Sequence, residues 1–250
     1  MVHLPPLPGS ARWGGDLDAV IARAVADAAA LAEGGMDAVL VENFFDAPFA
    51  RGRVPAATVA AMTAAALAVR RAACVPLGIN VLRNDVEAAL SIACACGAAF
   101  VRCNVYVGAA VTDQGILEGA ARRAQETRRR LGVDAEVWAD VEVKHAAQLA
   151  RRPIGEQARD AVERGLADAV IVSGPSTGAA TPLERIRAVK TAVRAPVLVG
   201  SGVHAASVRR LLAEADGAIV GTSLKAGGVD SPVDPERVRR LVEAARIRPG

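Results

Sequence analysis

Eight short apolar runs rich in β-branched residues alternate with eight helical patterns along the 250 residues, and this even alternation predicts a single (β/α)8 TIM barrel of the α/β class. The composition agrees, because 52% hydrophobic and 23% charged residues allow one large buried core. No linker rich in proline or serine interrupts the series, so we expect one domain over residues 1–250. A doubly wound sheet is the alternative, but it would not need eight units of such even spacing.

The predicted strands are short apolar runs of the kind that a parallel sheet buries on both faces. In chain order they are Met1–Leu4, Ala38–Glu42, Leu77–Asn80, Phe100–Asn104, Glu136–Val141, Ala169–Ser173, Val197–Gly200 and Ala218–Gly221. The segments between them repeat apolar residues three and four positions apart, as amphipathic helices do. These helices are predicted at Asp16–Ala32, Ala56–Ala73, Val86–Cys96, Ile116–Leu131, Ile154–Arg164, Leu183–Val193, Ala205–Ala215 and Pro235–Arg246.

Three helix starts carry capping residues. The segment Thr181–Glu184 reads as an N-cap threonine, a proline in the first turn and a glutamate that reaches back to the cap. Asn84 with Glu87 offers the same capping box, and Asp234–Pro235 supplies a third cap. These signals place the starts of three predicted helices.

Polar residues at the ends of the predicted strands should converge, because the loops that follow the strands form one face of such a barrel. All three histidines and two of the three lysines, Lys144 and Lys225, lie at or near these ends. Since the other basic residues are arginines almost throughout, these two lysines point to a compact, titratable ammonium at a reaction site. The residues expected to orient a substrate are Asn80, Arg83, Asn104, Glu142, His145, Ser173 and Thr177.

Two glycine-containing turns, Gly200-Ser201-Gly202 and Gly221-Thr222-Ser223, follow the seventh and eighth strands. Glycine lets backbone N–H groups approach an anion closely, and the hydroxyls add further donors. Barrels often hold phosphate between these two loops, so we expect a phosphate cradle, with plain turns as the alternative. The loop after the sixth strand, with Gly174 and Gly178, either clamps the same ligand or is a long flexible connection.

The fifth strand and its exit place Asp140, Glu142 and Lys144 on one face if the period of two continues. Flanking carboxylates would hold the ammonium charged, so Lys144 is expected to act as an electrophile or proton donor, with Asp140 as its catalytic neighbour. A Schiff-base role would require desolvation of the amine. The alternative is a structural ion-pair network inside the barrel.

His3 ends the first strand and is the candidate general base, with Glu42 as the alternative. His145 is expected to point away from Lys144, and His204 fits a helix-capping role better than catalysis. The acids and His3 could instead hold a divalent metal, but they lack any tight ligand spacing. We therefore expect neither a metal nor a cofactor.

Several classes of partner are not expected. The arginine clusters lie on predicted helices without interleaved aromatic residues, which is typical of solvated helix faces rather than of a nucleic-acid surface. The uncharged stretch 54–69 is too short and too polar to span a membrane, and no signal peptide is visible, which indicates a cytoplasmic protein. The alanine-rich helix within this stretch is compatible with a homo-oligomer.

Motifs along the whole chain resemble those of the BtpA family of barrel proteins. They are Val2–Ser10, Glu42–Phe49, Leu82–Asp85, Phe100–Asn104, Asp113–Ile116, Ala139–His145, Val172–Gly174 with Thr177-Gly178, Gly200–Val203 and Val220–Lys225. The resemblance implies a TIM barrel. It implies no single reaction, since some members are linked to photosystem I biogenesis and others lie among carbohydrate-metabolism genes.

Two functions follow as alternatives. The first is an enzyme, of lyase or isomerase type, that binds a small phosphorylated metabolite such as a sugar phosphate or a nucleotide-like compound and uses acid–base chemistry. The second is a non-catalytic assembly or regulatory factor that uses the barrel as an interaction platform. An open, polar mouth would favour the enzyme, whereas an exposed apolar patch over an occluded rim would favour the platform.

Overall fold

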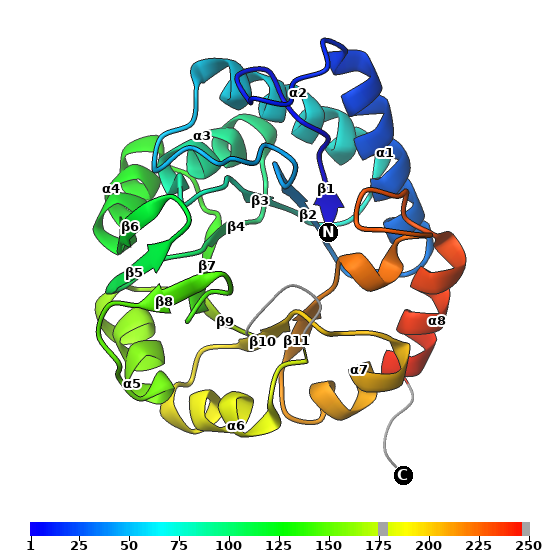
Figure 1. Cartoon of the computed structure of the whole chain (residues 1–250). Coiled ribbons are helices and arrows are strands. Elements are labelled where there is room, and N and C mark those ends of the chain that lie inside the picture. Colours follow the sequence, from blue (N-terminus) through cyan, green and yellow to red (C-terminus); the bar gives the residue numbers. More distant parts are fainter. Residues whose placement is uncertain (175–179, 247–250) are drawn as a thin grey trace.

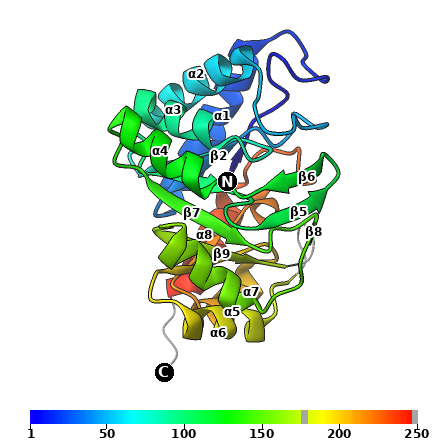
Figure 2. The same ribbon diagram turned by 90° about the vertical axis from the view of Figure 1, so that its left-hand side faces the viewer.

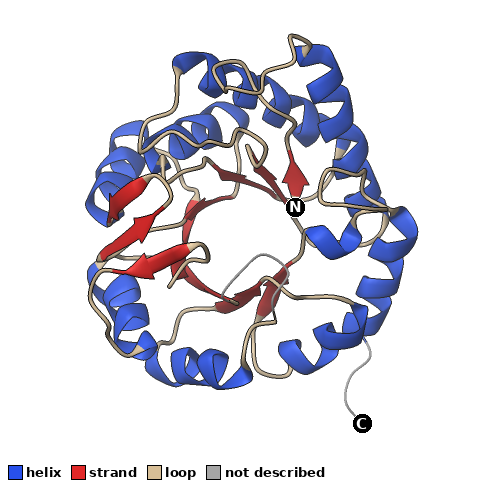
Figure 3. Ribbon diagram, in the orientation of Figure 1, coloured by secondary structure: helices blue, strands red, loops and turns tan. Residues whose placement is uncertain are grey.

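The computed structural model describes residues 1–174 and 180–246. Its centre is an eight-stranded parallel sheet that curls into a ring, with the helices outside (Figures 1 and 3). Around the sheet, the strands are β1 (Val2–His3), β2 (Val39–Glu42), β3 (Leu77–Asn80), β4 (Phe100–Cys103), β7 (Glu136–Val141), β9 (Ala169–Ser173), β10 (Val197–Gly200) and β11 (Gly217–Ile219). The predicted (β/α)8 TIM barrel is confirmed.

The helices of the outer ring follow the strands in turn. They are α1 (Leu17–Glu33), α2 (Ala56–Ala72), α3 (Val86–Cys96), α4 (Ala121–Leu131), α5 (Ile154–Arg159) with the π-helical turn Asp160–Arg164, α6 (Leu183–Ala192), α7 (Ala205–Leu212) and α8 (Pro235–Arg246). Among the described residues, none of these helices is both long and apolar enough to cross a bilayer.

The predicted cap of α8 is confirmed, because Asp234 Oδ1 accepts a 2.9 Å hydrogen bond from the N–H of Glu236. The other two predicted caps are wrong. Asp85, not Asn84, caps α3, since the Asn84 side chain is committed to the backbone of Val105. Thr181 does not cap α6 either, because its hydroxyl donates to the Gly200 carbonyl at 2.9 Å.

One predicted helix starts too early. Residues from Ile116 onward belong first to β6 (Gly115–Glu118), which pairs antiparallel with β5 (Ala109–Thr112), and α4 begins only at Ala121. The Thr112 hydroxyl closes the tight turn between these strands by donating to the Gly115 carbonyl at 2.9 Å. A third strand, β8 (Ala146–Gln148), completes a small sheet beside the ends of the barrel strands (Figure 2).

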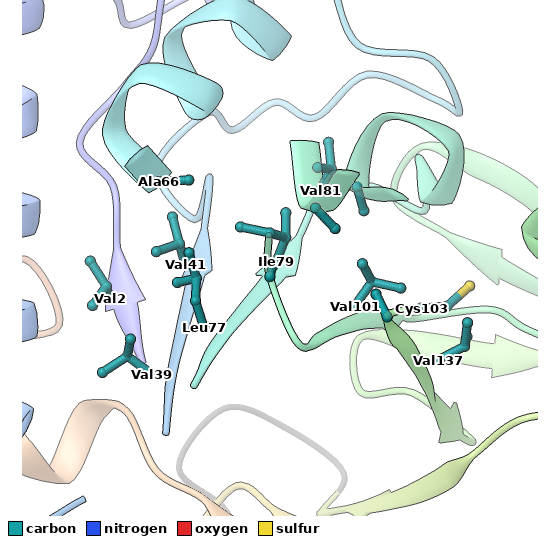
Figure 4. Packing of buried hydrophobic residues seen from close by; sticks show 14 of the residues in the cluster. Val2, Val39, Val41, Ala66, Leu77, Ile79, Val81, Val101, Cys103 and Val137 are labelled. Atoms are coloured by element: carbon teal, nitrogen blue, oxygen red, sulfur yellow. The ribbon is translucent and has the colours of Figure 1, made fainter. Parts of the chain in front are cut away.

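The main core lies between the barrel sheet and the surrounding helices. Because side chains alternate along a strand, every second residue of the barrel strands faces outward into this core. Figure 4 shows the outward-facing residues on five neighbouring strands together with Ala66 of α2. They include Val2, Val39, Val41, Leu77, Ile79, Val101, Cys103 and Val137.

The inward-facing residues form two layers. The lower layer is apolar, with the rings of Phe100 and Trp138 stacked at a centroid distance of 3.7 Å beside Leu40. Gly78 leaves room for this stack, since a Cβ there would lie only 2.1 Å from the Phe100 ring. Nearer the carboxyl ends of the strands the inward residues are polar and buried. They are His3, Glu42, Asn80, Arg102 and Asp140.

Candidate functional site

Arg102 of β4 is a central residue of the polar layer, and sequence reasoning misses it. Its guanidinium donates two hydrogen bonds of 2.9 Å to the carboxylate of Asp140 on β7. Asn104 donates a third to the same carboxylate at 2.8 Å. Although burial acts to lower the pKa of Arg102, the charges of Asp140 and Glu42 raise it, so the guanidinium is charged. Side chains alternate between the two faces of β4, and this alternation turns residues 100 and 102 into the barrel. It is the sequence signal that could have identified Arg102 as a site residue.

Glu42 and His3 lie on the neighbouring strands β2 and β1. Asn80 donates from Nδ2 to Glu42 Oε2, and the other carboxylate oxygen lies 3.9 Å from His3 Nε2. The His3 ring stacks on Phe44 at a centroid distance of 4.3 Å. Burial lowers the pKa of His3 well below its ordinary value, so the ring is neutral at pH 7. Its Nδ1 is buried without a hydrogen-bond partner among the described residues.

Lys144 follows β7 and reaches the same space, but its environment differs from the expected one. Burial and the charge of Arg102 lower its pKa, against the opposite effects of Glu42 and Asp140. Glu142 does not flank the ammonium; it pairs with Arg185 at 2.6 Å instead. The cause is that β7 ends at Val141, and the φ angle of +57° at Glu142 breaks the strand alternation.

The two loops after β10 and β11 lie together, as expected of a cradle. Ser223 joins them by donating from its hydroxyl to the Val203 carbonyl at 2.7 Å. Ser201 and Gly202 have φ angles of +71° and +65°, which turn the chain sharply after β10. A Cβ at Gly221 would lie 3.1 Å from His3 Cε1, so a larger residue there would require the His3 ring to shift by a few tenths of an ångström.

The cradle has unused hydrogen-bond donors. The backbone N–H groups of residues 201–203 and 221–223 find no acceptor in the part of the chain that the structure describes. The buried hydroxyl of Ser201 also lacks a partner there. Thr222 begins a short 3-10 helix at the same place. Five of these six residues are half-buried, and a cluster of N–H groups without protein acceptors on adjoining loops is an arrangement that suits an anion.

A cavity of about 220 Å³ brings the cradle and the polar layer together. Its walls include Ser201 and Thr222 from the loops and Glu42, Arg102 and Lys144 from the barrel. The sequence-predicted residues that line it are His3, Glu42, Lys144, Gly200, Ser201, Gly202, Gly221, Thr222 and Ser223. The structure therefore brings nine of the nineteen expected site residues together at one hollow.

A second cavity, of about 470 Å³, shares Glu42, Phe44, Arg102 and Lys144 with the first. It contains three more predicted residues, Arg83, Asn104 and His145. Arg83 is fixed there by a 3.0 Å hydrogen bond from Nη2 to the Lys144 carbonyl. Contrary to expectation, His145 and Lys144 line the same space, because the chain at His145 has a φ angle of +54° and is no longer a strand.

The remaining predicted residues lie elsewhere. Glu142, Ser173 and Gly174 line a third cavity of about 710 Å³, which touches the first two at Lys144. Asp140 is buried against Arg102 and lines neither of the first two cavities, and Asn80 is fully buried beside Glu42. Thr177 and Gly178 fall outside the described residues.

Lys225 is not part of the site, although its position after the last strand suggested it. Its ammonium is 1% exposed and pairs with Asp27 of α1 at 2.9 Å. Asp27 also accepts a hydrogen bond from the backbone N–H of Val233 at 2.8 Å, so the Lys225–Asp27 pair holds the loop that precedes α8 against α1. His204 occupies the N-cap position of α7, where its N–H donates to Ser207 Oγ at 3.1 Å.

No three histidine, cysteine or acidic side chains come together as a metal site within residues 1–174 and 180–246. In the polar layer, Arg102 forms an ion pair with Asp140, and the neutral His3 ring lies 3.9 Å from Glu42.

Fold and site together define a (β/α)8 barrel with a polar mouth and two adjoining glycine-containing loops after its last two strands. The chain belongs to the BtpA family, whose model matches residues 1–247. It is 47% identical to the photosystem I biogenesis protein BtpA of Synechocystis sp., over 98% of this chain and 86% of that protein. A protein of Archaeoglobus fulgidus is 48% identical over 98% of this chain and 97% of its own length.

Solved structures agree with the fold. Phosphoribosyl anthranilate isomerase from Thermus thermophilus superposes with a TM-score of 0.60 at 15% identity, covering 88% of this chain and 92% of the isomerase. Orotidine 5'-phosphate decarboxylase from Pyrococcus horikoshii also gives 0.60 at 15% identity, over 90% and 94% of the two chains. At this level of identity the likeness concerns the barrel alone.

Proposed function

We propose that the barrel binds a small phosphorylated metabolite, a sugar phosphate or nucleotide-like compound, and acts on it as a lyase or isomerase by acid–base chemistry. The observation that carries the proposal is the first cavity, which is lined by Glu42, Arg102 and Lys144 and by two loops whose backbone N–H groups have no acceptor among the described residues. The named isomerase and decarboxylase act, by their names, on phosphorylated compounds, but the proposal depends on this chain's own loops.

The phosphate would lie between Gly200–Gly202 and Gly221–Ser223, with the Thr222 hydroxyl as an additional donor. Both loops follow the last two barrel strands, where this fold commonly binds phosphate. Loop 221–223 needs no rearrangement for this, since Ser223 already ties it to the first loop.

The reacting part of the ligand would lie against Glu42, His3 and Lys144. A neutral His3 or an ionised Glu42 accepts a proton from carbon or oxygen, and Lys144 donates one to the developing oxyanion. Arg102 adds fixed positive charge, and Asp140 acts as a positioning residue because its carboxylate holds the guanidinium. In the proposal Asn80 is a positioning residue, because it holds the Glu42 carboxylate. The residues proposed to orient the rest of the substrate are Arg83, Asn104, Glu142, His145, Ser173 and Thr177.

The second candidate is a non-catalytic assembly factor, since the Synechocystis relative is named a photosystem I biogenesis protein. One observation favours it: Val111, Ile116 and Leu149, on and beside the small sheet, are 43%, 45% and 61% exposed. The polar, hollow mouth favours the enzyme, and we place that reading first.

A thermal-shift series tests the phosphate site. Ribose 5-phosphate and nucleoside monophosphates are compared with ribose and the nucleosides. A ligand at one hundred times its Kd should raise Tm by about 5–11 °C, since it adds about 2.7 kcal/mol to a chain of this size. Thr222→Glu places a carboxylate in the cradle and should abolish the shift, whereas Thr191→Glu, at an exposed position on α6, should not.

No shift with any phosphorylated compound would count against the phosphate site. Once a substrate is known, turnover separates the two candidates. Lys144→Ala should reduce kcat by about 10²–10⁴-fold if the ammonium transfers a proton. Full turnover in that variant and in Asp140→Ala would exclude the acid–base mechanism.

A further inference from the structure

Three of the four phenylalanines of this chain lie on the loop after β2 and face one cavity. Phe44, Phe45 and Phe49 are half-buried and line the second cavity, whereas Phe100 belongs to the lower layer of the barrel. The Phe44 and Phe45 rings meet edge to face at a centroid distance of 5.1 Å. Partly exposed aromatic rings that gather around a hollow rather than in the core are typical of ligand pockets.

The loop that carries these rings is held in place by buried polar contacts. Asp46 accepts hydrogen bonds from the Leu7 N–H at 2.8 Å and from Asn43 Nδ2 at 2.9 Å. Asn43 in turn accepts a 2.7 Å hydrogen bond from the N–H of Leu82. The aromatic wall is therefore fixed to the loops after β1 and β3, so little order is lost when a ligand binds against it.

Arg83 and Asn104 also line the second cavity. Arg83 Nε and Asn104 Oδ1 have no hydrogen-bond partner among the described residues, although these side chains are only 6% and 4% exposed. Arg12 and Asp113 add charge at the solvent edge of the same cavity. The aromatic rings and these polar side chains together suit a flat ring that stacks on phenylalanine and carries polar groups along its edge.

The second cavity joins the first at Glu42, Arg102 and Lys144, and its volume of about 470 Å³ lies within the range of small-molecule sites. We propose that the phosphorylated ligand carries a planar, unsaturated ring with polar edges, as in a nucleotide, and that this ring occupies the second cavity. This inference rests on the proposed function, since the phosphate in the first cavity anchors the ligand. Bond making and breaking would then occur between the phosphate and the ring, beside Lys144.

Titration calorimetry tests the ring site with a fixed set of probes: inorganic phosphate, ribose 5-phosphate, the nucleoside 5'-monophosphates of adenine, guanine, cytosine and uracil, and the free nucleosides. We expect at least one nucleotide to bind ten or more times tighter than ribose 5-phosphate. Phe45→Ala should lower that nucleotide's affinity by about 5- to 150-fold, the range of one base–aromatic stack, and leave ribose 5-phosphate unchanged.

Phe45→Leu keeps an apolar side chain on a folded loop and should lose most of the same preference. Phe100→Leu is the matched control, because it alters a phenylalanine at the other end of the barrel and should preserve the ratio of affinities. Equal affinities for ribose 5-phosphate and every nucleotide, or an equal loss for both in Phe45→Ala, would overturn the ring site and leave the phosphate site standing. Failure of every phosphorylated probe would overturn both.

Discussion

The substitution Asp140→Asn tests whether the polar layer depends on the buried pair of Arg102 and Asp140. The two side chains are 6% and 0% exposed and meet through two hydrogen bonds of 2.9 Å. At an effective dielectric constant of about 20, Coulomb's law gives roughly 6 kcal/mol for unit charges at that distance. Removing one partner of such a pair typically costs about 3–5 kcal/mol, because the other charge stays buried without compensation.

The assay is urea unfolding at pH 7, with the free energy of unfolding obtained by linear extrapolation. A loss of about 3 kcal/mol corresponds to a Tm lower by about 6–12 °C for a chain of this length. The pair Arg122–Glu126 provides the control, because its atoms lie 2.7 Å apart while its side chains are 89% and 59% exposed. Glu126→Gln should cost less than about 0.5 kcal/mol, as exposed pairs do.

A double variant separates the charge from the packing. Arg102→Met with Asp140→Leu removes both buried charges and should recover much of the stability lost in Asp140→Asn, although it should not bind ligand. Equal costs for Asp140→Asn and Glu126→Gln would refute the reasoning, as would a double variant less stable than the single one.

Two further predictions concern His3 and the pair of Lys225 with Asp27. Burial lowers the pKa of His3, so below about pH 6.5 the unfolded chain binds a proton that the folded chain does not. The free energy of unfolding should therefore decrease as the pH falls, by up to about 1.4 kcal/mol per pH unit. His3→Asn should flatten the curve of unfolding free energy between pH 6.5 and 5, and an unchanged slope would contradict a neutral His3. Lys225→Met leaves the buried Asp27 carboxylate and should cost about 3–5 kcal/mol in urea unfolding. Its ligand affinity should equal that of the parent protein, and a specific loss of binding would place Lys225 in the site after all.

The barrel could be predicted because its evidence is local and repeated. Each strand is a short apolar run, and each helix has its own periodicity, so an error such as the early start of α4 at Ile116 changes one element and not the architecture. The loops after β10 and β11 were also predictable, since glycine and hydroxyl residues follow the last two strands. Position in the barrel then brings them together.

The rest of the site depends on contacts between distant residues. Lys225 is adjacent in sequence to the cradle, yet its partner Asp27 lies 198 residues away and turns it out of the mouth. Glu142 was placed by continuing the strand alternation beyond the point where β7 ends. The aromatic wall could not be foreseen either, because its position depends on the link from Asp46 to the loop after β1.

The two layers of the barrel interior explain how charged groups can be kept at its mouth. Below the polar layer, the stacked rings of Phe100 and Trp138 fill the lumen with apolar surface. Burial lowers the pKa of both His3 and Lys144. The shift keeps His3 neutral at pH 7 and moves Lys144 toward the range in which an amine exchanges protons at neutral pH. Arg102 remains charged because the Asp140 carboxylate pairs with it at 2.9 Å. The apolar layer that stabilises the barrel thus also contributes to the burial of the groups on which the proposed chemistry depends.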